Sequence, residues 1–260
     1  SDLTTVIDWA WRIPFLSSFV LVAVGLYVRL KLTEAPIFIA ALKKPKPKTL
    51  PMMEVIVTHF KPFFLGMLIC MAGYVLFYIM IAFSQIYAKS APIISEAGYV
   101  MGLGFSPQIF TALLMCSAIS LAITIAISGK YIDIVGRRIW LIWTTVGVAL
   151  FGLALPYFLK NGTTVSLFWF LITGMGLIGM GYGPLSSFLP ELFPTHARYS
   201  GASLTYNIAG LFGASVAAII ALPLNANYGL KGVGIYLTLN AVLSLIGLWF
   251  ITETRDRQLL

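Results

Sequence analysis

Long apolar runs separated by short polar connections dominate this chain. Seven runs are long enough to cross the hydrocarbon core of a bilayer, which takes about 20 helical residues at about 1.5 Å each. They lie near residues 13–30, 62–86, 108–128, 139–159, 165–189, 200–223 and 232–251. The pattern therefore predicts an all-α polytopic membrane protein with seven transmembrane helices.

The connection at residues 129–138 carries the densest charge between these runs. The apolar runs that flank it, Gln108 to Ser128 and Ile139 to Phe158, contain no Lys, Arg, Asp or Glu. A short basic stretch between two such runs is typical of a tight turn joining two membrane spans. We call residues 129–138 the hinge segment.

Composition agrees with a membrane location. Of the 260 residues, 59% are hydrophobic and 10% are charged, which leaves too little polar surface to cover a soluble domain. The net charge of +8 does not indicate a nucleic-acid partner, because the basic residues sit at the ends of apolar runs and not on one face. The partner that this pattern predicts is the lipid bilayer.

No cofactor or metal site is predicted from the sequence. Cys70 and Cys116 lie inside apolar runs, without the spacing of a metal site or a redox motif. The segment Gly174 to Gly179 fits GxGxxG, but it lies within a membrane run, where glycines allow close helix packing instead of dinucleotide binding. Motifs of hydrolases and metalloproteases are absent from the sequence, so an enzyme is not expected.

The positive charges are distributed unevenly between alternate connections. One set of ends and connections holds thirteen of the seventeen Lys and Arg residues, whereas the other holds Arg12, Lys89, Lys160 and Lys231. By the positive-inside rule the richer set is cytoplasmic. We therefore expect a multi-pass protein of the plasma membrane, the inner membrane of a bacterium, with its N-terminus outside and its C-terminus in the cytoplasm.

A connection rich in Lys and Pro, centred on residues 43–48, separates the first run from the other six. It resembles the central loop between two six-span halves. This organisation predicts that residues 1–30 are the last span of an N-terminal half whose remainder is missing. Residues 31–61 would be the cytoplasmic central loop, residues 62–251 a six-helix C-terminal half, and residues 252–260 a cytoplasmic tail.

The hinge segment carries a resemblance to a known family. Gly129, Asp133, Gly136, Arg137 and Arg138 fit the G-x-x-x-D-x-x-G-R-R loop of the major facilitator superfamily. Three more segments match in order, at Leu32–Phe38, Pro190–Ser203 and Glu253–Arg257. The Phe-Pro-Thr-x-x-Arg-Tyr-Ser form within the second of these, with Trp11–Pro14, is most similar to the metabolite:proton symporters, which include proline/betaine, shikimate and dicarboxylate permeases.

This resemblance implies a fold and an activity. The chain would correspond to spans 6–12 of a twelve-span transporter that moves a small organic solute by proton symport with alternating access. Asp133, Arg137 and Arg138 would belong to a gating loop with Gly129 and Gly136, and Glu191 and Arg198 to a second loop on the same side. The alternative is that these charges only anchor the turns among lipid headgroups.

A solute cavity requires polar groups at mid-depth that face inward. Tyr74, Tyr78 and Gln85, at i, i+4 and i+11, share one helical face. Tyr182, beside Pro184, and Asn207, next to Tyr206, complete the predicted cavity. The alternatives are ordinary packing for the tyrosines and an interhelical hydrogen bond for Asn207.

Pro184 lies inside the fifth predicted span. It predicts a kink or a broken helix, and the backbone carbonyl that it leaves free must find a partner on a neighbouring helix or in a cavity.

The acidic residues and both histidines lie in connections or at span ends. We therefore expect the proton-binding residue in the missing N-terminal half. The predicted partners of this chain are thus a small solute, protons and that N-terminal half. The alternative function is a non-transporting fragment or assembly partner that needs a complementary half.

Overall fold

The computed structural model describes residues 9–31 and 51–253, which belong to two compact units, Ser1–Lys46 and Pro47–Leu260. In the first unit, helix α2 (Arg12–Lys31) coincides with the first predicted span. The matched segment Leu32–Phe38, the Lys and Pro residues at 43–48 and the tail beyond Glu253 lie outside the described residues.

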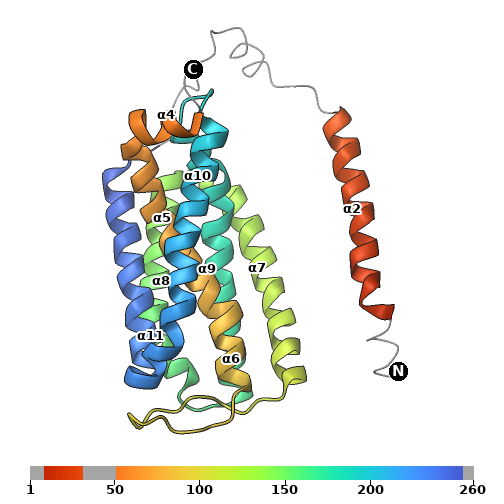
Figure 1. Cartoon of the computed structure of the whole chain (residues 1–260), viewed down its shortest axis with the longest axis vertical. Helices are drawn as coiled ribbons and strands as arrows, with labels where there is room; N and C mark the ends of the chain where they lie inside the picture. The colour runs from red at the N-terminus through yellow and green to blue at the C-terminus, as the bar shows by residue number, and fades with distance from the viewer. Residues whose placement is uncertain (1–8, 32–50, 254–260) are drawn as a thin grey trace. The chain divides into compact units, whose positions relative to one another are not determined.

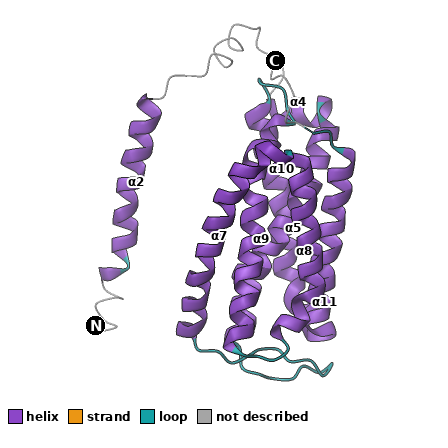
Figure 2. Cartoon of the chain, turned by 180° about the vertical axis from the view of Figure 1, so that it is seen from behind, coloured by secondary structure: helices purple, strands orange, loops and turns teal. Residues whose placement is uncertain are grey.

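The second unit is a bundle of long helices, shown from two sides in Figures 1 and 2. Its elements in chain order are α4 (Pro51–Thr58), α5 (Phe60–Tyr78), the π-helix η2 (Ile79–Phe83), α6 (Ser84–Lys89), α7 (Pro107–Val135), α8 (Arg137–Leu159), α9 (Thr164–Glu191), α10 (Arg198–Gly210), the π-helix η3 (Leu211–Ser215) and α11 (Val216–Phe250). No strand occurs in the described ranges, and the one isolated bridge joins Ile94 to Val100. The prediction of an all-α polytopic membrane protein is confirmed.

Five helical stretches of this unit are long and apolar enough to cross a membrane. The last of them, Arg198–Phe250, has 53 residues, too many for one span at about 1.5 Å each. Gly229 breaks it with φ 67° and ψ −167°, a conformation that residues with a Cβ rarely adopt. The six runs predicted between residues 62 and 251 therefore all correspond to helices.

The helices extend beyond the predicted runs at their polar ends. The predicted hinge turn is helical as far as Val135, so a single residue, Gly136, separates α7 from α8. The predicted central loop 31–61 also contains a helix, α4. Its Val55 is fully buried against the bundle, which explains why this short segment is ordered as a helix.

The two ends of the bundle differ. We call the end that contains Gly136, Glu191 and Glu253 the hinge end, and the end that contains the connections 90–106 and 160–163 the loop end. Each end has its own buried apolar cluster, around Phe188 and Leu248 at the hinge end and around Phe110, Phe170 and Leu237 at the loop end. In Figures 1 and 2, α7 and α11 lie at opposite edges of the bundle.

Helices α7 and α9 approach closely through small residues. Gly176, Gly179 and Gly183 of α9 face Ser120, Thr124 and Ser128 of α7. Ser120 donates to the Ile172 carbonyl at 3.1 Å, and Ser128 donates to the Gly179 carbonyl at 3.4 Å. The GxGxxG segment therefore serves helix packing, as predicted.

Helix α9 runs through Pro184 without a break. Because proline has no amide hydrogen, the Met180 carbonyl one turn earlier loses its usual partner. The indole Nε1 of Trp140 on α8 donates to that carbonyl at 2.9 Å. The prediction that a neighbouring helix satisfies the freed carbonyl is confirmed. Of the two predicted forms, a kinked helix or a broken one, the break does not occur.

We expect Gly179→Ala to lower the free energy of unfolding by about 1–3 kcal/mol, because overpacking of a tight contact costs this much. A Cβ at Gly179 would lie 2.6 Å from the Leu121 carbonyl oxygen. Gly181→Ala, on the same helix, meets only Thr144 at 3.7 Å and is the matched control. Unfolding of each variant by SDS in mixed micelles measures the difference, and equal stability of the two would contradict this account of the α7–α9 contact.

Candidate functional site

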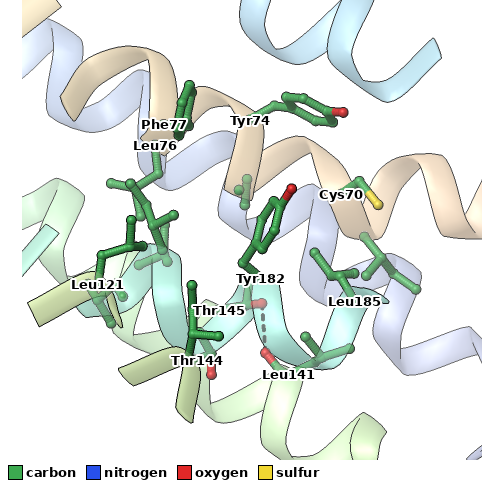
Figure 3. Close-up of a pocket in the computed structure, with 18 of the residues that line it drawn as sticks. Cys70, Tyr74, Leu76, Phe77, Leu121, Leu141, Thr144, Thr145, Tyr182 and Leu185 are labelled. Atoms are coloured by element: carbon green, nitrogen blue, oxygen red, sulfur yellow. Dashed lines mark hydrogen bonds between the residues drawn. The ribbon is translucent and has the colours of Figure 1, made fainter. Parts of the chain in front are cut away.

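A cavity of about 300 Å³ opens between five helices of the second unit. Its lining comes from α5, α7, α8, α9 and α10, and Figure 3 shows most of it. The lining residues are Ile69, Cys70, Ala72, Gly73, Tyr74, Leu76, Phe77, Leu121, Ile125, Leu141, Thr144, Thr145, Val148, Leu177, Ile178, Gly181, Tyr182, Leu185 and Tyr206. Such a mainly apolar cavity with a few convergent polar groups is typical of small-molecule sites.

Three tyrosines supply most of the polarity of this cavity. Tyr74 of α5 and Tyr206 of α10 are in ring contact, with centroids 5.0 Å apart. Tyr182 extends from α9 toward α5, which carries Tyr74, as Figure 3 shows. Since 54% of the Tyr182 surface is exposed, its ring lies at the open side of the cavity.

The remaining polar groups of the lining have partners in their own helix. Thr144 donates to the Trp140 carbonyl at 3.0 Å, and Thr145 donates to the Leu141 carbonyl at 2.7 Å. None of the residues that line the cavity is charged. The site therefore offers aromatic faces and hydroxyl groups to a ligand.

Two of the five predicted cavity residues, Tyr74 and Tyr182, line this cavity. Tyr78 lies one turn further along α5 and donates to the Ala218 carbonyl at 3.3 Å. Asn207 is exposed and donates to the Ser203 carbonyl of its own helix at 2.8 Å. Gln85 is exposed on α6. The structure does not bring these last three into the lining.

The predicted face from Tyr74 to Gln85 assumed a regular α-helix. The π-helix η2 at Ile79–Phe83 lies between them, and a π-turn shifts the register of the residues that follow it. Sequence reasoning also passed over Thr144 and Thr145, whose inward direction depends on how α8 packs against α9. Tyr206 was listed among the polar residues of its span, but its neighbour Asn207 was preferred. The cavity is lined by Tyr206 and not by Asn207.

At the hinge end, Arg137 connects three helices. Its guanidinium forms an ion pair with Glu191 at the end of α9, and lies 3.5 Å from Asp133 on α7. The side chains of Arg137 and Glu191 are 17% and 14% exposed, whereas that of Asp133 is 71% exposed. Charges paired away from water interact more strongly than exposed ones, so Glu191 is the principal partner of Arg137.

Arg138 and Glu253 cap each other's helices. The Glu253 carboxylate accepts hydrogen bonds from the backbone amides of Arg137 and Arg138, at 3.2 Å and 3.0 Å, at the start of α8. The Arg138 side chain donates to the carbonyls of Leu248 and Trp249, at 2.8 Å and 3.0 Å, at the end of α11. Each charged group thus pairs with backbone groups that have no partner within their helix. The negative charge lies at the N-terminus of α8 and the positive charge at the C-terminus of α11, which is the favourable arrangement for both helix dipoles.

Gly136 makes this arrangement possible. Its φ of 101° and ψ of 140° turn the chain between α7 and α8 in one residue, and it has no side chain to cap α8 itself. A Cβ at this position would lie 3.0 Å from the Glu253 carboxylate. The other predicted gating residues flank these turns: Gly129 lies on the exposed side of α7, and Arg198 begins α10 after the turn that follows Glu191.

Comparison with known proteins gives a family match. The sequence model of the Major Facilitator Superfamily matches residues 3–218. No solved structure matches the chain.

Several bacterial transport proteins are similar to the chain. A Haemophilus influenzae protein, provisionally named a metabolite transport protein, is 86% identical over 252 residues, which are 97% of this chain and 56% of that protein. The inner membrane metabolite transport protein YhjE of Escherichia coli is 40% identical over 97% of this chain and 56% of its own length. The proline/betaine transporter of Salmonella typhimurium is 27% identical over 97% of the chain and 50% of its own length. The chain thus spans about half the length of the curated relatives it matches.

We expect Glu191→Gln to lower the free energy of unfolding by about 1–3 kcal/mol, because it leaves the half-buried Arg137 guanidinium with only the exposed Asp133 as an opposite charge. Asp133→Asn, which removes the exposed partner of the same arginine, should cost about 1 kcal/mol or less. SDS unfolding in mixed micelles compares the two variants. A larger loss for Asp133→Asn would contradict the assignment of Glu191 as the principal partner.

Glu253→Ala should cost about 0.5–2 kcal/mol, the usual effect of removing a helix N-cap. Glu253→Gln keeps an acceptor but removes the charge, so we expect a smaller loss. Glu96→Ala, which deletes an exposed carboxylate in the connection 90–106, is the control. If Glu96→Ala and Glu253→Ala unfold at the same SDS fraction, the carboxylate of Glu253 does not cap α8.

Proposed function

Because this chain belongs to the major facilitator superfamily, we propose that it is the C-terminal half of a secondary transporter that moves a small organic solute by proton symport. The names of its relatives point to transport and not to catalysis. The six spans of Pro47–Leu260 would form one half of the transporter, and α2 would be the last span of the other. That these relatives are nearly twice as long supports a second half.

The tyrosine-lined cavity is the observation that carries this proposal. It lies inside the helix bundle, it has a volume suited to a small molecule, and it is open at Tyr182. In the proposed transporter this opening faces the N-terminal half, so that the two halves enclose the solute between them. Rocking of one half against the other would then expose the site to each side of the membrane in turn.

The lining supports a solute with a cationic or hydroxylated part. Aromatic faces such as those of Tyr74, Tyr182 and Tyr206 attract quaternary ammonium groups, and phenol hydroxyls bind polar oxygens. Two of the curated relatives are named for proline and betaine, and for glycine betaine, proline, ectoine and pipecolic acid. We propose a compatible solute of this chemical class, or an organic acid whose carboxylate is bound by the other half.

Proton coupling would then depend on the N-terminal half. No carboxylate or imidazole lines the cavity, and the acidic side chains of the described residues lie at helix ends or in connections. The proton-binding group and any counter-charge for an ionic solute are therefore assigned to the partner half. We still propose that Tyr78, Gln85 and Asn207 contribute to solute binding. They would do so at the surface between the two halves, or in another conformation of the transporter.

The hinge end is proposed to face the cytoplasm of a bacterium, across its inner membrane. In residues 51–253 it holds Lys61, Lys130, Arg137, Arg138 and Arg198, while the loop end holds Lys89, Lys160 and Lys231. This excess follows the positive-inside rule. We propose that the ion pair between Arg137 and Glu191, with the neighbouring caps, stabilises the closed hinge end in the outward-open state.

We expect membrane vesicles that carry the full-length transporter to accumulate one of four labelled solutes, glycine betaine, proline, shikimate or 2-oxoglutarate, only when an inward proton gradient is imposed. For a cationic solute, Tyr182→Ala should raise KM about tenfold, since a desolvated cation–π contact contributes about 1–2 kcal/mol. Tyr182→Phe should retain most of the affinity. Tyr157→Ala, which removes an exposed ring of α8 outside the cavity, is the matched control.

Each other outcome has a distinct meaning. Loss of uptake in Tyr182→Phe would assign the contact to the phenol hydroxyl and favour an organic acid. Uptake that ignores the gradient would contradict symport and leave a facilitator. Vesicles that accumulate none of the four solutes would favour the alternative, a non-transporting assembly partner.

A further inference from the structure

Three metal-ligating side chains converge outside the cavity, at the hinge end. The Nε2 atom of His196 lies 2.7 Å from Oε1 of Glu54, and the Nε2 atom of His59 lies 4.0 Å from the same oxygen. One ligating atom from each of the three residues lies within 4.8 Å of the others. The sequence analysis did not group these residues, because His196 is far from Glu54 and His59 along the chain.

Packing holds the three side chains in place. Glu54 lies on α4 next to Val55, which is fully buried in the same cluster as Leu192 and Phe193. His59 continues the turn of α4, since its amide donates to the Val55 carbonyl at 3.1 Å. The turn that carries His196 is closed by a hydrogen bond from the Ala197 amide to the Pro194 carbonyl at 3.0 Å. Two separate segments therefore present their ligands to one point.

The geometry points to a metal site: we propose that Glu54, His59 and His196 bind one divalent transition-metal ion of the zinc class. Two imidazoles and one carboxylate are a common ligand set for zinc, which leaves a fourth position for water. Ligating atoms about 2.0–2.2 Å from a tetrahedral ion are separated by roughly 3.3–3.6 Å, and the present separations lie on both sides of this range. Small rotations of the side chains would bring all three atoms to the ion.

The environment favours an ion over a simple hydrogen bond. The side chain of Glu54 is only 14% exposed, and its second oxygen, Oε2, is buried with no hydrogen-bond partner among the described residues. A hydrogen bond between Glu54 and His196 leaves Oε2 of Glu54 without a partner. It also leaves the His59 Nε2 atom 4.0 Å from Oε1, too far for a hydrogen bond. A bound cation would compensate the carboxylate charge and use the second imidazole. His196 is 47% exposed, which gives the ion a path from solvent.

A bound ion would clamp α4 to the turn between α9 and α10. This role is independent of the solute cavity, because neither segment contributes to the cavity lining. It would add to the packing of Val55 a second connection between α4 and the bundle, one that depends on the supply of metal.

Isothermal titration of the purified full chain, without a polyhistidine tag, with ZnCl₂ tests the site. We expect one Zn²⁺ per chain and a rise in the thermal midpoint on binding. His196→Ala should weaken binding about a hundredfold or more, since even groups that only orient a metal ligand contribute about 10-fold to 100-fold. Cys116→Ser, which removes an exposed thiol, should bind Zn²⁺ as the unchanged chain does.

A second variant and a second ion keep the test decisive. If His196→Ala does not fold, His59→Gln gives the same comparison from the other segment. Co²⁺ should give visible absorption bands of a low-coordinate nitrogen and oxygen site, which Zn²⁺ displaces. Absence of stoichiometric binding, or affinity unchanged in both histidine variants, would overturn the metal site and leave a hydrogen-bonded contact between Glu54 and His196.

Discussion

A membrane helix that ends at the edge of the hydrocarbon leaves backbone amides or carbonyls that other protein groups have to satisfy. At the hinge end, α8 and α11 solve this problem for each other through Glu253 and Arg138. For Glu253 to reach the amides at the start of α8, the turn before α8 must have no side chain, and Gly136 meets this requirement. Arg137, the first residue after this turn, pairs with Glu191 and so connects the start of α8 to the end of α9.

Much of the fold follows from the apolar pattern, because the membrane requires long uninterrupted helices. The exact helix ends do not follow from this pattern. Polar residues mark where the chain leaves the lipid, but the backbone hydrogen bonds of a helix can continue beyond that point. Lys130, in the segment that was predicted to turn between two spans, therefore lies on α7. Helix α4 was missed for a related reason. It is short and lies in a polar connection, and the burial of Val55 depends on contacts with residues that follow much later in the chain.

The candidate site was predictable only in part. Tyr74 and Tyr182, two of the five polar residues predicted for the cavity, line it, whereas Tyr78, Gln85 and Asn207 do not. The extrapolation to Gln85 depended on a constant helical period, which η2 interrupts. The sequence grouped Asp133 with Arg137 and Arg138 in one loop, whereas the more buried partner of Arg137, Glu191, comes from a helix that only the three-dimensional fold brings near. The histidine and glutamate cluster has the same origin in tertiary contacts.

The exchange between Arg138 and Glu253 joins residues 115 positions apart, so it also constrains the order in which the protein is made. Helices α7 and α8 leave the ribosome long before Glu253 does. Until then, the amides at the start of α8 and the guanidinium of Arg138 must form hydrogen bonds with interfacial water and lipid headgroups. Completion of the hinge end is therefore a late event in biosynthesis, which closes a junction between helices that were inserted into the membrane much earlier.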